Sequence, residues 1–196
     1  MFVGRKKELD ALNSRYKSNR KEFGVLYGRR RIGKSSILNE FLKDKKGILF
    51  QAKQDNSYGN LKSFSYEVDH LLNLPDTFVF ASWQHAFKSI QEYAKNERFV
   101  LVIDEYPYIV SQDSSFSSVL QEFIDHASDN MMVILSGSDI GFLQKEIQNH
   151  ASPLYKRRTF EMEIKKMNFM DAKEFVKMED VESQANYLCL MSGYPY

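Results

Sequence analysis

The sequence contains a single cysteine, Cys189, and no apolar run longer than five residues. One cysteine can neither form an internal disulfide nor supply a cysteine metal cluster, and this usage favours a reducing cytoplasm. A membrane-spanning helix needs roughly 20 apolar residues, far more than the runs at 99–103 and 131–135 provide. The N-terminal segment 1–8 turns charged at Arg5, too early to leave the apolar stretch that a signal peptide needs. We therefore expect a cytoplasmic protein that does not enter a membrane.

Aromatic residues are abundant, and charge is unevenly distributed. The 15 phenylalanines and 11 tyrosines among 196 residues supply ample core material for one domain and the start of another. Residues 1–46 hold 14 Lys/Arg against 5 Asp/Glu, a net charge of +9, whereas the remaining 150 residues carry a net charge of −8. The first part therefore favours a polyanion such as a nucleotide or nucleic acid. The alternative is a solvated basic face without a ligand.

Short apolar segments alternate with amphipathic ones along most of the chain. The spacing of apolar residues predicts strands at 23–27, 47–51, 99–103, 131–135 and 159–164. It predicts helices at 8–16, 34–43, 61–71, 83–93, 116–126 and 140–147. Buried strands separated by helices are typical of a parallel sheet covered on both faces, so the expected fold class is α/β.

The last residues differ from the rest. Residues 168–177 and 181–191 have helical spacing, and the chain then stops in the apolar, turn-like segment 193–196. We expect the chain to be truncated at this point.

Residues 28–35, Gly-Arg-Arg-Arg-Ile-Gly-Lys-Ser, match the phosphate-loop pattern G-x-x-x-x-G-K-[ST] between a predicted strand and a predicted helix. Glycines let several backbone N–H groups point at one phosphate, and the helix adds its positive N-terminus. Lys34 is expected to reach the β- and γ-phosphates, and the Ser35 hydroxyl to bind Mg²⁺. The expected phosphate-binding residues are Gly28, Arg29, Arg30, Arg31, Ile32, Gly33, Lys34, Ser35 and Ser36. For the three arginines, the alternative is that they face solvent or an acidic neighbour.

Two carboxylates, Asp104 and Glu105, follow the most apolar predicted strand. Ligands bind at the carboxyl ends of the strands in an open parallel sheet. We expect Asp104 to hold Mg²⁺ and Glu105 to take a proton from the attacking water. The alternative is a pair of surface acids that cap a strand. We assign no role to the aromatic residues at 106 and 108.

Polar residues after the fourth predicted strand are further candidates. Ser136, or else Ser138, would sense the γ-phosphate or position water, unless the segment is a plain Ser-Gly turn. Arg157 or Arg158, just before the last predicted strand, would stabilise transition-state charge in its own subunit or in a neighbour's. The alternative for these two arginines is a basic surface turn.

Together, these motifs resemble the archaeal-type ATPases, phosphate-loop enzymes close to the AAA+ and STAND ATPases. The resemblance also covers Phe2-Val-Gly-Arg5, 135–138, 153–159 and 191–196. It implies that Val3, Gly4 and Arg5 lie near the adenine. It further implies a five-stranded parallel sheet in the order 5-1-4-3-2, sandwiched by helices. Two positions depart from the family pattern, because Lys156 and Ser192 stand where glycine is common.

The resemblance divides the chain into an ATP-binding core at 1–166 and the start of a helical lid at 167–196. A winged-helix region, absent from this chain, is implied beyond the lid, so DNA is a partner that only the resemblance suggests. Self-association is also expected to be possible.

Three functions remain open. The leading hypothesis is Mg²⁺-dependent ATP hydrolysis coupled to work on, or switching of, a DNA or protein partner. A slow nucleotide-gated switch that binds ATP or ADP is the alternative, and Glu105 favours hydrolysis. A phosphotransferase acting on a small molecule is the weakest hypothesis.

Overall fold

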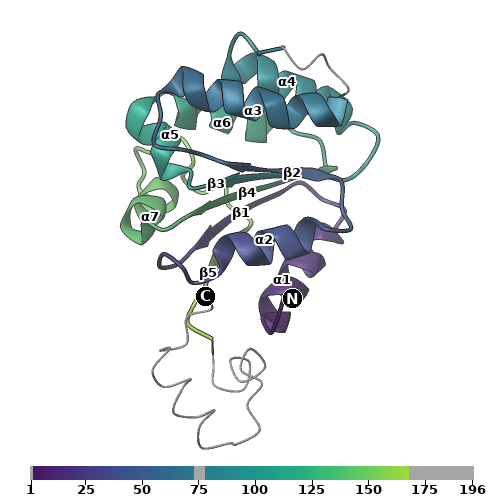
Figure 1. The fold of residues 1–196 in the computed structure, drawn as a ribbon, viewed down its shortest axis with the longest axis vertical. Coiled ribbons are helices and arrows are strands. Elements are labelled where there is room, and N and C mark those ends of the chain that lie inside the picture. Colours follow the sequence, from purple (N-terminus) through teal and green to yellow (C-terminus); the bar gives the residue numbers. More distant parts are fainter. Residues whose placement is uncertain (1, 73–77, 168–196) are drawn as a thin grey trace, which may run out of the picture.

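The computed structural model describes residues 2–72 and 78–167 of the chain. The sequence hypotheses on the lid helices, on Cys189 and on the segment 191–196 lie outside these residues. The described part contains seven helices and five strands, with one or two helices between successive strands (Figure 1). None of its helices has the length and apolarity that a membrane crossing requires.

Five parallel strands form the central sheet. They are β1 (Glu22–Tyr27), β2 (Gly47–Gln51), β3 (Phe99–Asp104), β4 (Met131–Gly137) and β5 (Phe160–Glu163). Their order is β2-β3-β4-β1-β5, which confirms the expected order 5-1-4-3-2. The three central strands β1, β3 and β4 are buried along their whole length, as the continuous apolar runs predicted.

Helices cover both faces of this sheet (Figure 1). On one face lie α1 (Lys6–Tyr16) and α2 (Lys34–Leu42). On the other lie α3 (Ser57–Leu72), α4 (Trp83–Tyr93), α5 (Pro107–Gln112), α6 (Phe116–His126) and α7 (Ile140–Gln148). Alternate strand residues enter opposite cores: Leu101 and Val133 face the α3–α7 layer, whereas Val102 and Ile134 face α1 and α2.

The structure corrects three details of the sequence interpretation. Strand β4 continues through Ser136 to Gly137, two residues beyond the predicted end. Helix α5 was not predicted, because six residues opened by Pro107 are too short to show a period. Helix α3 begins at Ser57, four residues before the helix predicted at 61–71, and Asn60 within it is buried. The Asn60 amide makes hydrogen bonds with both backbone groups of Lys53.

Candidate functional site

The expected site residues meet at the carboxyl ends of β1, β3 and β4. The phosphate loop follows β1, Asp104 and Glu105 come at the end of β3, and Ser136 and Ser138 come at the end of β4. The three strands are neighbours in the sheet, so segments that lie far apart in sequence share one edge. The topology therefore brings these sequence-predicted residues to one edge of the sheet.

The backbone of the phosphate loop explains its glycines. A Cβ at Gly28 would lie 2.5 Å from the carbonyl oxygen of Ile164, so only glycine fits between the loop and the segment after β5. Gly33 has φ 93°, a left-handed conformation that glycine adopts without strain, and α2 begins at the next residue. The loop therefore turns directly into a helix N-terminus, where backbone N–H groups favour an anion.

Lys34 is the buried cation of this loop, with 5% of the residue exposed. Its Nζ donates to the carbonyl oxygens of Gly28 at 3.0 Å and Arg29 at 3.3 Å. Burial lowers the pKa of Lys34 from its ordinary value, although the nearby carboxylates of Glu105 and Asp104 act in the opposite direction. An ammonium that has lost most of its water is well suited to pair with an incoming phosphate.

Asp104 is fully buried and accepts three hydrogen bonds. Its Oδ2 accepts from the Ser35 hydroxyl at 2.6 Å, and its Oδ1 accepts from the Glu105 amide at 3.0 Å and from the Ser136 hydroxyl. Ser136 thus lies inside β4 and orients Asp104. The described residues hold no group of three or more His, Cys, Asp or Glu side chains suited to a metal. Oxygens of Ser35 and Asp104 fit Mg²⁺, which needs few protein ligands when phosphates and water complete its shell.

Glu105 has φ 52°, an uncommon backbone conformation for a residue other than glycine. Its Oε2 accepts from the backbone N–H of Ser138 at 3.2 Å and from the Ser138 hydroxyl at 3.1 Å. The two serines that the sequence left as rivals therefore have different partners. Ser136 contacts the candidate metal ligand, and Ser138 contacts the candidate base.

Arg5 connects three segments beside the phosphate loop. Its guanidinium donates to the backbone oxygens of Ile32 at 2.9 Å and Lys165 at 2.8 Å, and to the Glu8 carboxylate at 2.8 Å. Gly4, the preceding residue, has φ 67°, and Val3 is buried. A cleft of about 260 Å³ adjoins these contacts, because Ile32 and Lys165 are among the residues that line it. It is lined by Gly28, Arg29, Ile32, Ile140, Glu163, Ile164, Lys165 and Lys166.

The three loop arginines are exposed, as the alternative interpretation has it. Arg30 donates to the Tyr108 hydroxyl at 2.9 Å, and Arg31 has φ 61°. Ser36 is also exposed. The geometry therefore supports backbone groups of this loop as phosphate ligands more strongly than its arginine side chains.

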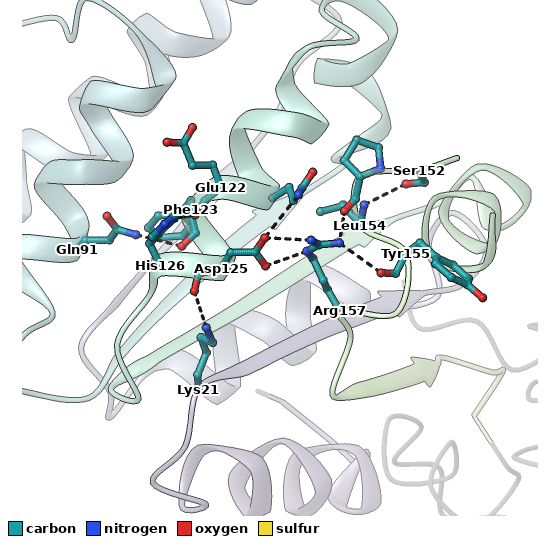
Figure 2. Close-up of polar contacts among 12 residues, drawn as sticks. Lys21, Gln91, Glu122, Phe123, Asp125, His126, Ser152, Leu154, Tyr155 and Arg157 are labelled. Carbon is teal, nitrogen blue, oxygen red and sulfur yellow. Dashed lines mark hydrogen bonds and ion pairs between the residues drawn. The ribbon is translucent and has the colours of Figure 1, made fainter. Parts of the chain in front are cut away.

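Arg157 and Arg158 lie at the opposite edge of the sheet, because they directly precede β5. Figure 2 shows Arg157 beside Asp125. Arg157 precedes β5 and forms a two-pronged ion pair with Asp125, with Nε–Oδ1 at 2.8 Å and Nη2–Oδ2 at 3.0 Å. Arg158 donates to the Ile147 carbonyl at 3.0 Å and pairs with Glu161. Six residues of β1 at about 3.3 Å each separate this edge from the phosphate loop, a distance of roughly 20 Å. Neither arginine is brought to the site of its own chain.

Lys156 is one of the two positions at which the sequence departs from the pattern of the family it resembles. Lys156 has φ 57°, a left-handed conformation in which glycine is the least strained residue. A lysine is accommodated here, although glycine would adopt this conformation with less strain.

The geometry is thus that of a phosphate-loop nucleotide site with an acidic pair. Residues 2–187 match the family described as an ATPase domain predominantly from Archaea. The chain belongs to this archaeal ATPase family. An uncharacterized protein of Methanocaldococcus jannaschii is 28% identical over 198 residues, covering 100% of this chain and 43% of that protein.

Solved structures share the ATPase fold. The Walker-type ATPase of Pyrococcus abyssi matches with a TM-score of 0.80 at 20% identity, over 99% of this chain and 65% of that one. The ORC1 protein of Aeropyrum pernix, solved in complex with DNA, matches with a TM-score of 0.66 at 13% identity, over 95% of this chain and 50% of that one. This ATPase chain therefore spans less than two thirds of each of these relatives.

Proposed function

We propose that this ATPase domain binds ATP together with Mg²⁺ at the carboxyl edge of its sheet and hydrolyses it with Glu105 as general base. The convergence of Lys34, Ser35, Asp104 and Glu105 on one edge carries the proposal. The Ser35–Asp104 hydrogen bond links the phosphate loop directly to the acidic strand end.

The phosphates, the Mg²⁺ ion and the base of the nucleotide are each assigned to specific residues. The phosphates would meet the loop amides and the Lys34 ammonium, and Ser35 and Asp104 would hold Mg²⁺. The ion supplies charge neutralisation on the phosphate oxygens when it is bound. The base would enter the cleft beside Ile32 and Ile140, and Arg5 donates hydrogen bonds to the carbonyls of two residues that line this cleft, Ile32 and Lys165.

Hydrolysis needs a base that can reach a water molecule in line with the γ-phosphate. Glu105 lies next to the candidate metal ligand, and its carboxylate is oriented by Ser138. In the proposed step, water attacks the γ-phosphorus, its proton passes to the Glu105 carboxylate, and the bond to the ADP oxygen breaks. Lys34 offsets the negative charge on the phosphate oxygens during the attack.

We propose that Arg157 or Arg158 acts on ATP bound by a neighbouring copy of the chain. Because Arg157 and Arg158 lie at the edge opposite the phosphate loop, either one could reach a γ-phosphate only in a second subunit. An arginine supplied in this way contributes about 10³–10⁵ in rate. The isolated chain is then expected to turn over slowly. Coupling of this cycle to DNA or to a protein partner is part of the same proposal, and the A. pernix relative solved with DNA is consistent with a DNA partner.

A slow nucleotide-gated switch is the second candidate. It draws on the hydrogen bonds from Ser138 to Glu105, since they engage Oε2, one of the two carboxylate oxygens that could accept the proton. The two functions differ in turnover and share the binding site.

The test is phosphate release per subunit, measured against protein concentration, with and without DNA, for the parent, Arg157→Ala and Arg158→Ala. We expect a slow rate that rises with concentration and loses this rise in at least one arginine variant. A high rate that is independent of concentration and of both arginines would contradict the arginine role. Tight binding of ATP without measurable release under every condition would favour the switch.

A further inference from the structure

Tyr106, to which the sequence pattern assigned no role, follows Glu105 directly and is fully buried. Its backbone N–H donates to the carbonyl oxygen of Ser136 at 3.0 Å, so the chain after Glu105 is attached to β4. Glu105 itself has the left-handed φ of 52°, which neighbouring contacts must maintain. The residue after the candidate base is therefore one of the groups that hold its backbone.

The Tyr106 hydroxyl ends in a small polar cluster away from the nucleotide site. It lies 2.7 Å from the Ser117 hydroxyl of α6 and donates to Oε2 of Glu146 on α7 at 3.0 Å. The Ser117 hydroxyl lies 3.1 Å from the same Glu146 oxygen. Burial raises the pKa of Tyr106 well above its ordinary value, and the Glu146 charge acts in the same direction. The hydroxyl therefore keeps its proton and remains a donor.

The ring and the hydroxyl of Tyr106 contribute differently. The ring packs against Phe116 and Phe142, with centroids 6.0 and 6.1 Å away, and a phenylalanine would preserve these contacts. The hydroxyl adds a hydrogen bond between the segment after β3 and α7, and the packing of the ring does not depend on this bond. This link is specific, because it needs an acceptor at the position of the Glu146 carboxylate.

Helix α7 also begins beside the candidate base. Asp139 is its N-cap, and the preceding residue, Ser138, holds the Glu105 carboxylate through its amide and hydroxyl. Glu105 is thus attached in two ways, at its backbone through Tyr106 and at its carboxylate through Ser138. The Tyr106–Glu146 hydrogen bond joins the two attachments, because it fixes α7 relative to the end of β3.

We propose that Tyr106 is a positioning residue for Glu105. Its hydroxyl acts through Glu146: the hydrogen bond fixes α7, and α7 in turn keeps Ser138 within hydrogen-bond distance of the Glu105 carboxylate. The inference rests on the proposed function, since it assigns the hydroxyl an effect on the hydrolysis step. Removal of the hydroxyl lowers the rate of hydrolysis and leaves nucleotide affinity unchanged, because the phosphate loop makes none of these contacts.

The experiment is single-turnover hydrolysis of ATP with the chain in excess, together with calorimetric measurement of nucleotide affinity. Tyr106→Phe is expected to slow hydrolysis roughly tenfold with an unchanged dissociation constant. Glu146→Ala should match it, whereas Glu146→Gln, which keeps an acceptor oxygen, should restore most of the rate. The double variant Tyr106→Phe/Glu146→Ala should be no slower than either single variant. Tyr93→Phe, the same chemical change beside Phe99, is the matched control and should behave like the parent.

A parental rate in Tyr106→Phe and Glu146→Ala would overturn the inference. So would a parallel fall in affinity and rate, which indicates general damage to the fold, or a Glu146→Gln variant as slow as Glu146→Ala, which shows that the acceptor oxygen is not what matters. If Tyr106→Phe does not fold, the Glu146→Ala and Glu146→Gln pair answers the same question. The proposed function fails separately, through a Glu105→Gln variant that hydrolyses ATP at the parental rate.

Discussion

The two edges of the parallel sheet carry polar residues of different character. At the carboxyl edge, Asp104 is fully buried and Lys34 is 5% exposed, and their polar atoms have partners within the site. At the amino edge, the Arg157 and Asp125 side chains are 30% and 40% exposed and form an ion pair. Buried charges need such partners to be tolerated at all, whereas a surface pair adds little to stability.

Under the proposed function, the carboxyl edge carries the reaction with ATP, and the amino edge carries the contact with a second chain. Charges in the low-dielectric carboxyl edge act strongly on a phosphate, because little water screens them. Arg157 at the amino edge is 30% exposed, and under the proposed function it would exchange its ion pair with Asp125 for a phosphate of a second chain. Four variants, taken from the largest expected effect to the smallest, test this division.

Lys34→Ala is expected to abolish ATP binding or weaken it severely. The change removes charge-assisted hydrogen bonds to phosphate that contribute about 1.5–3 kcal/mol each, which is roughly ten- to a hundredfold in affinity per bond. Isothermal titration calorimetry with ATP and Mg²⁺ measures the change, and thermal unfolding checks the fold. Lys43→Ala, an exposed lysine after α2, is the control. Unchanged affinity in Lys34→Ala would refute the phosphate-loop assignment.

Glu105→Gln is expected to bind ATP almost normally and to hydrolyse it at least about 10²-fold more slowly, because only the general base is lost. Single-turnover phosphate release, set beside calorimetry, separates the two quantities. Asp104→Asn provides the contrast, since it should weaken the Mg²⁺ dependence of binding. If Glu105→Gln retained the parental rate, the base would have to be another group.

Ser138→Ala is expected to slow hydrolysis about fivefold, the effect of one neutral hydrogen bond of about 1 kcal/mol. The effect stays small because the backbone N–H of residue 138 still donates to Glu105. Rates are compared at saturating ATP, where binding no longer contributes. Acceleration in place of loss would show that the serine restrains the base, as the switch function requires.

Asp125→Asn is expected to change stability by at most about 1 kcal/mol, since both partners of its ion pair are partly exposed. Hydrogen bonding to Arg157 lowers the pKa of Asp125 below its ordinary value of 3.8. The contribution of the pair is therefore complete at neutral pH and is lost as the pH falls below about 4. Urea unfolding at pH 7 and pH 3 tests this, and Glu122→Gln on the same helix is the control. Because the folded-state pKa lies below 3.8, the difference should be smaller at pH 3 than at pH 7, and an undiminished difference at pH 3 would contradict the ion-pair origin.

Local patterns predicted the α/β class and the candidate residues at the centre of the site, whereas the strand order came from the family resemblance. The apolar run 99–103 and the phosphate-loop motif are contiguous in sequence, so burial and backbone conformation can be inferred from neighbouring residues alone. Asp104 and Glu105 follow from the same logic, because parallel strands present their carboxyl ends at one edge. The limits of these elements were less predictable, since the end of β4 depends on pairing with β1.

The choice of partners was decided only by tertiary structure. Arg157 pairs with Asp125 across 32 positions, and Tyr106 reaches Glu146 across 40. No periodic signal links such residues, because a hydrogen bond depends on where two elements pack and which way each side chain leaves the backbone. For the same reason, the sequence left Ser136 and Ser138 as alternatives. In the structure, Ser136 in β4 donates to Asp104, and Ser138, just after β4, donates to Glu105.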